Sequence, residues 1–63
     1  MNWMLRLADV RAMTGLGRST IYRKMAKGEF PNAVKLSERA IGWPQGDIER
    51  WLQERIDAGR VAS

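Results

Sequence analysis

The strongest constraint on this chain is the segment of residues 7–28, in which glycines divide two short helical patterns. Apolar residues recur every three positions up to residue 13, which predicts an amphipathic helix over about residues 8–14. Gly15 interrupts this pattern, and isoleucine and methionine four positions apart then restart it. Because Gly28 tolerates the left-handed conformation that ends a helix, we expect a second helix over residues 18–26. The segment therefore predicts two short helices joined by a tight turn.

The rest of the chain predicts a β-hairpin followed by a third helix. Residues 33–36 and 40–43 alternate in polarity on either side of a turn at residues 37–39, which is typical of paired strands. Pro44 precedes a helix over about residues 45–58, whose apolar residues recur at spacings of three and four. The fold is therefore mainly α with a small β-hairpin. The predicted core consists of Leu7, Val10, Met13, Leu16, Ile21, Met25, Phe30, Val34, Leu36, Ile41, Trp43, Ile48, Trp51 and Leu52.

Length and composition exclude several classes of site. A chain of 63 residues forms one domain, and a domain this small buries only about 60% of its unfolded surface. We expect residues 1–63 to be that domain, with an ordered core over residues 5–58 and a frayed tail over residues 60–63. The chain has no cysteine and no histidine, so it lacks disulfides and the usual metal ligands. No cofactor, metal or small-molecule ligand is expected.

The apolar runs of the chain are only a few residues long, which excludes a membrane-spanning helix and a membrane partner. The amino terminus also lacks a basic segment followed by a long apolar stretch, so we expect no signal peptide. Since the absence of cysteine fits a reducing compartment, a cytoplasmic location is expected. The sequence does not decide the role of Trp3, whose indole either covers the core or takes part in self-association.

Charge is unevenly distributed along the chain. The net charge is +1 over residues 1–14, +4 over residues 15–39 and −1 over residues 40–63. A cluster of basic residues is typical of a protein that binds a polyanion, although a solvated basic surface explains it equally well. The cluster coincides with the second helix and the hairpin, and two helices joined by a glycine turn form a helix-turn-helix. Together they predict a winged helix-turn-helix that binds double-stranded DNA, with the hairpin as the wing.

The second helix carries the candidate DNA-binding residues. Residues near the start of such a recognition helix face base edges most directly. The candidates for base readout are Arg18, Ser19, Thr20 and Arg23. The candidates for contacts to the DNA backbone or through the wing are Tyr22, Lys24, Lys27, Lys35 and Arg39. Ser19 and Thr20 have a structural alternative, which is to bond first-turn amides, and the alternative for Arg18 is a solvated surface charge.

Catalysis and metal binding are not expected. The carboxylates are scattered, no serine lies near a plausible base, and Asp47, Glu49 and Glu54 fit the solvated face of the last helix better than a metal site. Two binding alternatives stay open. A protein-interaction module would use apolar or acidic faces, and an RNA-binding protein would need a helix that fits the narrow major groove of A-form RNA.

The order of motifs resembles a known family. The motifs are L-x-x-V at Leu7 and Val10, G-L at Gly15 and Leu16, R-S-T-I-Y at residues 18–22, G-x-F-P at residues 28–31, V-K-L at residues 34–36, I-G-W at residues 41–43 and I-x-x-W at Ile48 and Trp51. Over residues 5–56 the chain is similar to the AlpA family of prophage transcriptional regulators, within the MerR-like and excisionase-like winged helix-turn-helix group. Gly17, where the family has a capping residue, and the entry Pro44-Gln45-Gly46 depart from its pattern.

The resemblance implies a cofactor-free regulator of a prophage or integrative element that binds specific sequences in duplex DNA. It also implies an alternative, an excisionase that bends attachment-site DNA. The family's wing contacts fall on Lys35, Ser37 and Arg39, and its helix contacts fall on residues 18–20, 22 and 23. Because a single module of this size buries only about 600–1,000 Å² on DNA, a second copy of the chain is also an expected partner. The alternative of another class is a small adaptor that docks on an integrase or another regulator, and an integrase is the partner that this alternative predicts.

Overall fold

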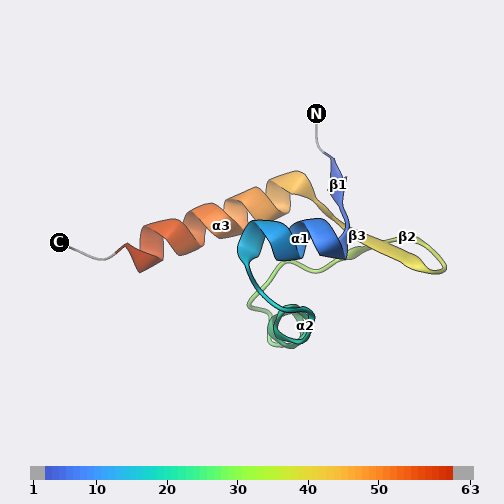
Figure 1. The fold of residues 1–63 in the computed structure, drawn as a ribbon, viewed down its shortest axis with the longest axis horizontal. Coiled ribbons are helices and arrows are strands. Elements are labelled where there is room, and N and C mark those ends of the chain that lie inside the picture. The colour runs from blue at the N-terminus through green and yellow to red at the C-terminus, as the bar shows by residue number, and fades with distance from the viewer. Residues whose placement is uncertain (1–2, 61–63) are drawn as a thin grey trace.

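The computed structural model describes residues 3–60 as three helices and three short strands (Figure 1). In chain order these are β1 (Met4–Leu5), α1 (Leu7–Thr14), α2 (Arg18–Ala26), β2 (Val34–Ser37), β3 (Ala40–Pro44) and α3 (Gln45–Gly59). The predicted mainly α fold with a hairpin between the second and third helices is confirmed, and α2 has the predicted bounds. The frayed tail expected over residues 60–63 lies, apart from Arg60, outside the described residues.

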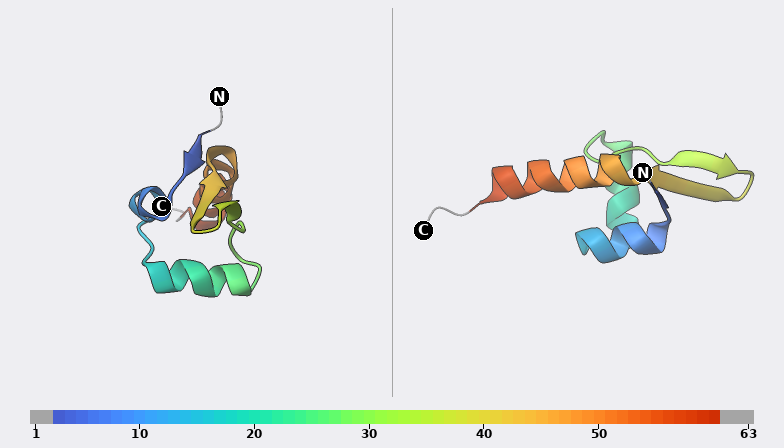
Figure 2. Two further views of the ribbon diagram at one scale, coloured as in Figure 1. Left: turned by 90° about the vertical axis from the view of Figure 1, so that its right-hand side faces the viewer. Right: turned by 90° about the horizontal axis from the view of Figure 1, so that it is seen from above.

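The molecule is elongated because α3 and the β2–β3 hairpin extend in opposite directions, with principal extents of 47 × 28 × 19 Å (Figure 1). α1 lies beside the start of α3, where the sheet meets the helices. α2 lies beneath these elements and crosses the long axis, so that Figure 1 shows it end-on and Figure 2 shows it from the side. In these views no other element lies beyond α2, so its outer face forms one side of the molecule.

The turn between α1 and α2 requires a glycine. Gly15 has φ of +74°, in the left-handed region that other residues rarely adopt. The Thr14 hydroxyl donates to the Val10 carbonyl at 2.8 Å and accepts the Leu16 N–H at 3.2 Å, which fixes the turn against the end of α1. These contacts confirm the predicted glycine turn and direct α2 across α1.

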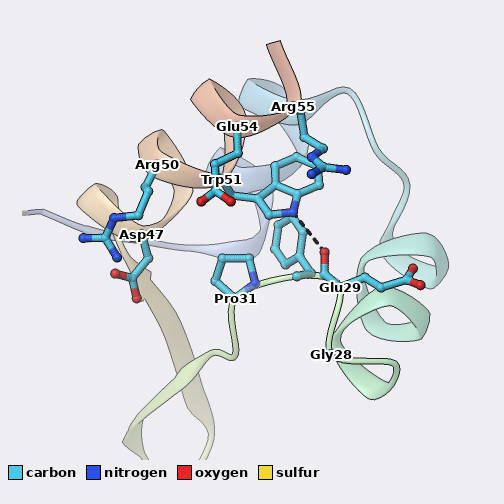
Figure 3. Close-up of a pocket in the computed structure, with 9 residues that line it drawn as sticks. Gly28, Glu29, Pro31, Asp47, Arg50, Trp51, Glu54 and Arg55 are labelled. Carbon is cyan, nitrogen blue, oxygen red and sulfur yellow. Dashed lines mark hydrogen bonds between the residues drawn. The ribbon is translucent and has the colours of Figure 1, made fainter. Parts of the chain in front are cut away.

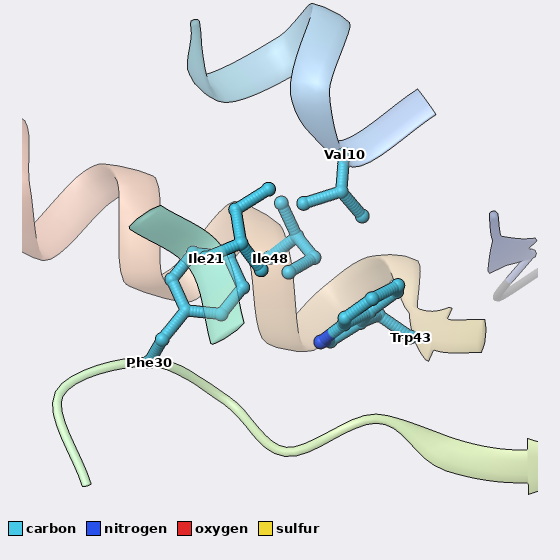
Figure 4. Close-up of a cluster of buried hydrophobic side chains, with 5 residues drawn as sticks. All are labelled: Val10, Ile21, Phe30, Trp43 and Ile48. Atoms are coloured by element: carbon cyan, nitrogen blue, oxygen red, sulfur yellow. The ribbon is translucent and has the colours of Figure 1, made fainter. Parts of the chain in front are cut away.

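Five buried side chains form the core, and they come from five different segments (Figure 4). They are Val10 of α1, Ile21 of α2, Phe30 of the connecting loop, Trp43 of β3 and Ile48 of α3. All five were predicted core residues. The partly buried residues that pack against them are Leu5, Leu7, Leu16, Met25, Ala33, Ile41, Trp51 and Leu52. Of these, Leu5 and Ala33 were not expected.

The sheet has three strands in the order β1-β3-β2, with both pairs antiparallel. The sequence predicted only the hairpin, and β1 adds a short strand that pairs Leu5 with Trp43. The Gln45 N–H donates to the Trp3 carbonyl at 2.7 Å, which joins β1 to the start of α3. The Trp3 side chain is 65% exposed, so its backbone rather than its indole has the visible structural role.

The core prediction is wrong for three residues, since Met13, Val34 and Leu36 are 40%, 45% and 42% exposed. The alternation in β2 separates two faces, but the hairpin extends past the helices (Figure 1), and all four residues of β2 are exposed. Leu36 lies over Gly42 of β3, since a Cβ at residue 42 would be 2.9 Å from its Cδ1. Met13 is three residues after Val10 and therefore lies about 60° to the side of it around α1.

Within residues 3–60, no helix combines the length and the apolar character that crossing a membrane requires.

Candidate nucleic-acid interface

α2 divides into a narrow buried side and a broad exposed side. Ile21 is its only buried residue. Ser19, Arg23 and Lys27 recur every four residues from the start of α2 to its C-cap, and all three are exposed. Since successive residues turn by about 100°, Ser19 and Arg23 point almost directly away from Ile21. We call Ser19, Arg23 and Lys27 the α2 outer row.

Arg18 and Tyr22 form a pair on the flank of α2. The guanidinium carbon of Arg18 lies 5.6 Å from the centre of the Tyr22 ring, and both residues are exposed. At an exposed site such a cation–π contact contributes about 0.5–1 kcal/mol. The contact orders the guanidinium beside the first turn of α2, but not on the side opposite Ile21.

Lys24 lies on the other flank and already has a partner. Its Nζ is 4.0 Å from Oε1 of Glu29, and the Lys24 side chain is 34% exposed. A surface pair of this kind is worth at most about 1 kcal/mol, so an anion can compete for the ammonium group. Of the candidates on α2, Lys24 and Thr20 are the two that are half-buried.

The two hydroxyl candidates at the start of α2 are not used for helix capping. Within residues 3–60, neither Ser19 nor Thr20 makes a side-chain hydrogen bond to the backbone. The N-cap is Gly17, which offers no side-chain acceptor to the first-turn amides. The first turn of α2 also contains no acidic residue, so no side chain of that turn neutralises the positive end of the α2 dipole.

The opposite end of α2 closes tightly. The Glu29 N–H donates to the Lys24 carbonyl at 2.8 Å and the Gly28 N–H donates to the Met25 carbonyl at 3.1 Å. Gly28 has φ of +73°, which this pair of bonds requires. The prediction that Gly28 terminates α2 is confirmed.

The wing candidates lie on the hairpin, away from the core. Lys35, Ser37 and Arg39 are all exposed. The pairing of β2 with β3 shifts between Lys35 and Ser37, and Arg39 lies in the turn that follows. Figure 1 shows the hairpin at one end of the molecule and α2 beneath the centre of the molecule. The candidate DNA-binding residues therefore lie in two groups on separate elements.

A surface groove of about 510 Å³ lies between the loop that follows α2 and the side of α3 (Figure 3). Sequence reasoning gave its residues no binding role. It is lined by Gly28, Glu29, Phe30, Pro31, Asp47, Arg50, Trp51, Glu54 and Arg55. Charges of both signs alternate along its α3 side, and within residues 3–60 no set of three acidic side chains could hold a metal ion.

The three helices, the hairpin after α2 and the basic outer side of α2 define a small winged helix-turn-helix protein. Residues 3–56 match the model of the family described as prophage CP4-57 regulatory protein (AlpA), and the chain belongs to this family. This confirms the resemblance seen in the sequence motifs.

Two relatives are similar over most of the chain. An uncharacterized protein, ORF88, of Enterobacteria phage P4 is 43% identical over 56 residues, which cover 89% of this chain and 62% of the phage protein. The chain thus spans less than two thirds of that relative. The DNA-binding transcriptional activator AlpA of Escherichia coli (strain K12) is 33% identical over 58 residues, which cover 82% of this chain and 83% of the activator.

Proposed function

We propose that this chain is a sequence-specific duplex-DNA-binding regulator of a prophage or integrative element. The observation that carries the proposal is the α2 outer row. Ser19, Arg23 and Lys27 are exposed on the side of α2 that points away from Ile21, and α2 itself forms one side of the molecule (Figure 2). A helix presented in this way fits the major groove of B-form DNA, which is about 12 Å wide.

Within the outer row, Arg23 is the residue that reads a base. Its guanidinium can bond guanine O6 and N7 together, a contact worth about 1–3 kcal/mol of discrimination. Ser19 and Thr20 bond a base edge or a phosphate near the start of α2. Arg18 is the second candidate for base readout. Its guanidinium is ordered against the Tyr22 ring before it contacts DNA.

Backbone contacts surround this centre. Lys27 at the end of the outer row, Lys24 beside it and the Tyr22 hydroxyl meet phosphates along the major groove. The wing supplies Lys35, Ser37 and Arg39 to the neighbouring backbone, with Arg39 close enough to the tip to enter a minor groove. Contacts to phosphate add affinity and salt dependence but no sequence information.

Membership of the AlpA family and the similarity to the DNA-binding transcriptional activator of E. coli support transcriptional regulation as the role. An excisionase that bends attachment-site DNA would use the same helix and wing. Since one small module buries only about 600–1,000 Å² on DNA, a second copy or an integrase bound alongside would add affinity. In this proposal the chain acts in the cytoplasm, binds no cofactor and catalyses no reaction.

The test starts from a random duplex library, from which the purified protein selects its preferred sequence. Fluorescence anisotropy then compares this sequence with scrambled duplex at two salt concentrations. The matched control is Arg60→Ala, because Arg60 is an exposed arginine at the far end of α3. We expect Arg23→Ala to lose the preference and Arg60→Ala to retain it.

Enrichment of one sequence, with salt-sensitive binding, would support the proposal, and a bend in the selected duplex on binding would favour the excisionase role. Failure to enrich any sequence, with equal binding to all duplexes at low salt, would refute sequence-specific recognition. Preserved preference after loss of both Arg18 and Arg23 would place base readout on other residues. No preference over scrambled duplex, even at low salt, would favour the protein-interaction alternative.

A further inference from the structure

The loop that joins α2 to β2, residues 27–33, contains no helix or strand, yet its backbone is bonded to two tryptophans from other elements. The Trp43 indole N–H donates to the Pro31 carbonyl at 2.9 Å. The Trp51 indole N–H donates to the Glu29 carbonyl, also at 2.9 Å (Figure 3). Trp43 is fully buried and belongs to the core. Trp51 is only half-buried and lies on the side of α3, so its bond needs a separate explanation.

Glu29 connects two helices through its own peptide groups. Its N–H donates to the Lys24 carbonyl at 2.8 Å and closes the last turn of α2. Its carbonyl accepts the indole N–H of Trp51 on α3. The end of α2 is therefore joined to the side of α3 through a single residue, with the Lys24–Glu29 ion pair as an additional contact.

The ring of Trp51 is itself held in place. It meets Phe30 edge-to-face with centroids 4.8 Å apart, and the Arg55 guanidinium carbon lies 5.9 Å from its centre. Phe30 is a buried core residue, so the indole is anchored to the core on one side. A ring fixed in this way directs its N–H at one point of the loop.

α2 has few other means of keeping its orientation. Ile21 is its only fully buried side chain, and Met25, one turn later on the same side, packs against the core while only partly buried. Contacts along one stripe hold α2 against the core but leave it free to tilt about that stripe. The glycine turn fixes the start of α2, and the Trp51–Glu29 bond fixes its end. We infer that Trp51 is a positioning residue for DNA recognition, which orients α2 and with it the α2 outer row. This inference rests on the proposed function.

The consequence concerns specificity more than affinity. Base contacts require the outer row at a defined depth and angle in the groove, whereas contacts to phosphates tolerate small rotations. Loss of the indole N–H should therefore weaken binding to the preferred duplex while binding to scrambled duplex changes little. A residue that only stabilised the fold would not change this ratio at a temperature where every variant is folded.

The experiment compares wild type, Trp51→Phe and Glu54→Ala by anisotropy against preferred and scrambled duplex, well below the melting temperature of each protein. Trp51→Phe keeps an aromatic ring but removes the N–H donor. Glu54→Ala is the control because Glu54 is an exposed residue of α3 close to Trp51 that makes no hydrogen bond or ion pair within residues 3–60. We expect the ratio of specific to non-specific affinity to fall about three- to tenfold in Trp51→Phe, as for one hydrogen bond, and to stay within about twofold in Glu54→Ala.

If Trp51→Phe does not fold, a synthetic chain with a benzothiophene in place of the indole at residue 51 answers the same question, because it keeps the ring shape without the N–H. An unchanged ratio in a folded variant that lacks the donor would overturn the inference and leave the proposed function intact. Wild-type protein that shows no preference for any duplex would overturn the proposed function, and the inference with it.

Discussion

α2 and α3 are amphipathic helices of the same small domain, but they use their surfaces differently. α3 has fifteen residues and buries Ile48 completely, with Trp51 and Leu52 packed beside the core. α2 has nine residues and buries Ile21 alone. Most of the surface of α2 is thus left in solvent, where it carries arginine, lysine and hydroxyl groups.

The difference shows how 63 residues accommodate both a core and a binding surface. Four of the five core side chains lie outside α2, in α1, β3, α3 and the loop that follows α2, and burial of apolar side chains provides the main driving force for folding. α2 is held by Ile21, by the partly buried Met25 and by its two ends, so the residues of its outer side do not take part in core packing. We expect substitutions on α3 and the sheet to change stability, and substitutions on the outer side of α2 to change binding.

The largest expected effect is that of Ile48→Ala on α3. Ile48 is fully buried, and removing its branched side chain leaves a cavity beside Val10, Ile21 and Trp43. The free energy of unfolding should fall by about 2–5 kcal/mol. Thermal and urea denaturation followed by circular dichroism measure this loss.

The matched control is Ile56→Ala on the same helix, because Ile56 is 47% exposed. Its free energy of unfolding should stay within about 0.5 kcal/mol of wild type, as at most surface positions. Equal losses at residues 48 and 56 would mean that the end of α3 is covered in solution, which would contradict the assignment of Ile56 to an open surface.

The next largest effect tests whether the sheet, like α3, contributes to the stability of the fold. In Gly42→Ala, the added Cβ would lie 2.9 Å from Cδ1 of Leu36 and 3.0 Å from the Leu5 carbonyl. Leu36 can move aside, but the backbone of β1 cannot do so without weakening its pairing with β3. We expect a loss of about 1–3 kcal/mol in unfolding free energy, as for other overpacked sites.

Gly59→Ala is the control for this change, since a Cβ at residue 59 would meet no atom within 4 Å. Urea denaturation should show little change for this variant. If Gly42→Ala were as stable as wild type, β1 would be able to move aside without cost. The sheet would then contribute less to stability than α3 does.

Sequence patterns predicted α2 and α3 well because their causes are local. Glycines and helical spacing set the ends of α2, and the spacing from Ile48 to Leu52 marks the buried side of α3. β1 could not be found in this way. It has only two residues, and its partners, Trp43 and Pro44, lie nearly forty positions further along the chain. A strand this short has no pattern of its own.

The hairpin shows a second limit of local patterns. Alternation places Val34 and Leu36 on one face of β2, but whether anything covers that face depends on how far the hairpin extends from the helices. The candidate site shows the same limit. The charges on α2 are evident in the sequence, but the contacts of Arg18 with Tyr22 and of Trp51 with Glu29 require the folded arrangement.

Arg23→Ala tests the other side of the comparison, because Arg23 lies in the middle of the α2 outer row. We expect binding to the preferred duplex to weaken by about 1–3 kcal/mol at one base pair, while the unfolding free energy stays within about 0.5 kcal/mol. Anisotropy against duplexes with single base changes measures the first quantity, and urea denaturation measures the second. A uniform loss over all duplexes would instead place Arg23 on a phosphate.

Lys35→Ala should have the smallest effect, and it distinguishes the contribution of the wing to DNA binding from that of α2. Lys35 is an exposed side chain on β2, opposite Ile41 and next to the shift in strand pairing. If it meets a phosphate, its loss should weaken preferred and scrambled duplex alike and reduce the slope of log affinity against log salt by about 1. Lys35→Arg keeps the charge and should restore both values, with anisotropy over a salt series as the measurement. A loss confined to one sequence would show that the wing reads DNA shape or bases, and recognition would then be shared between the wing and α2.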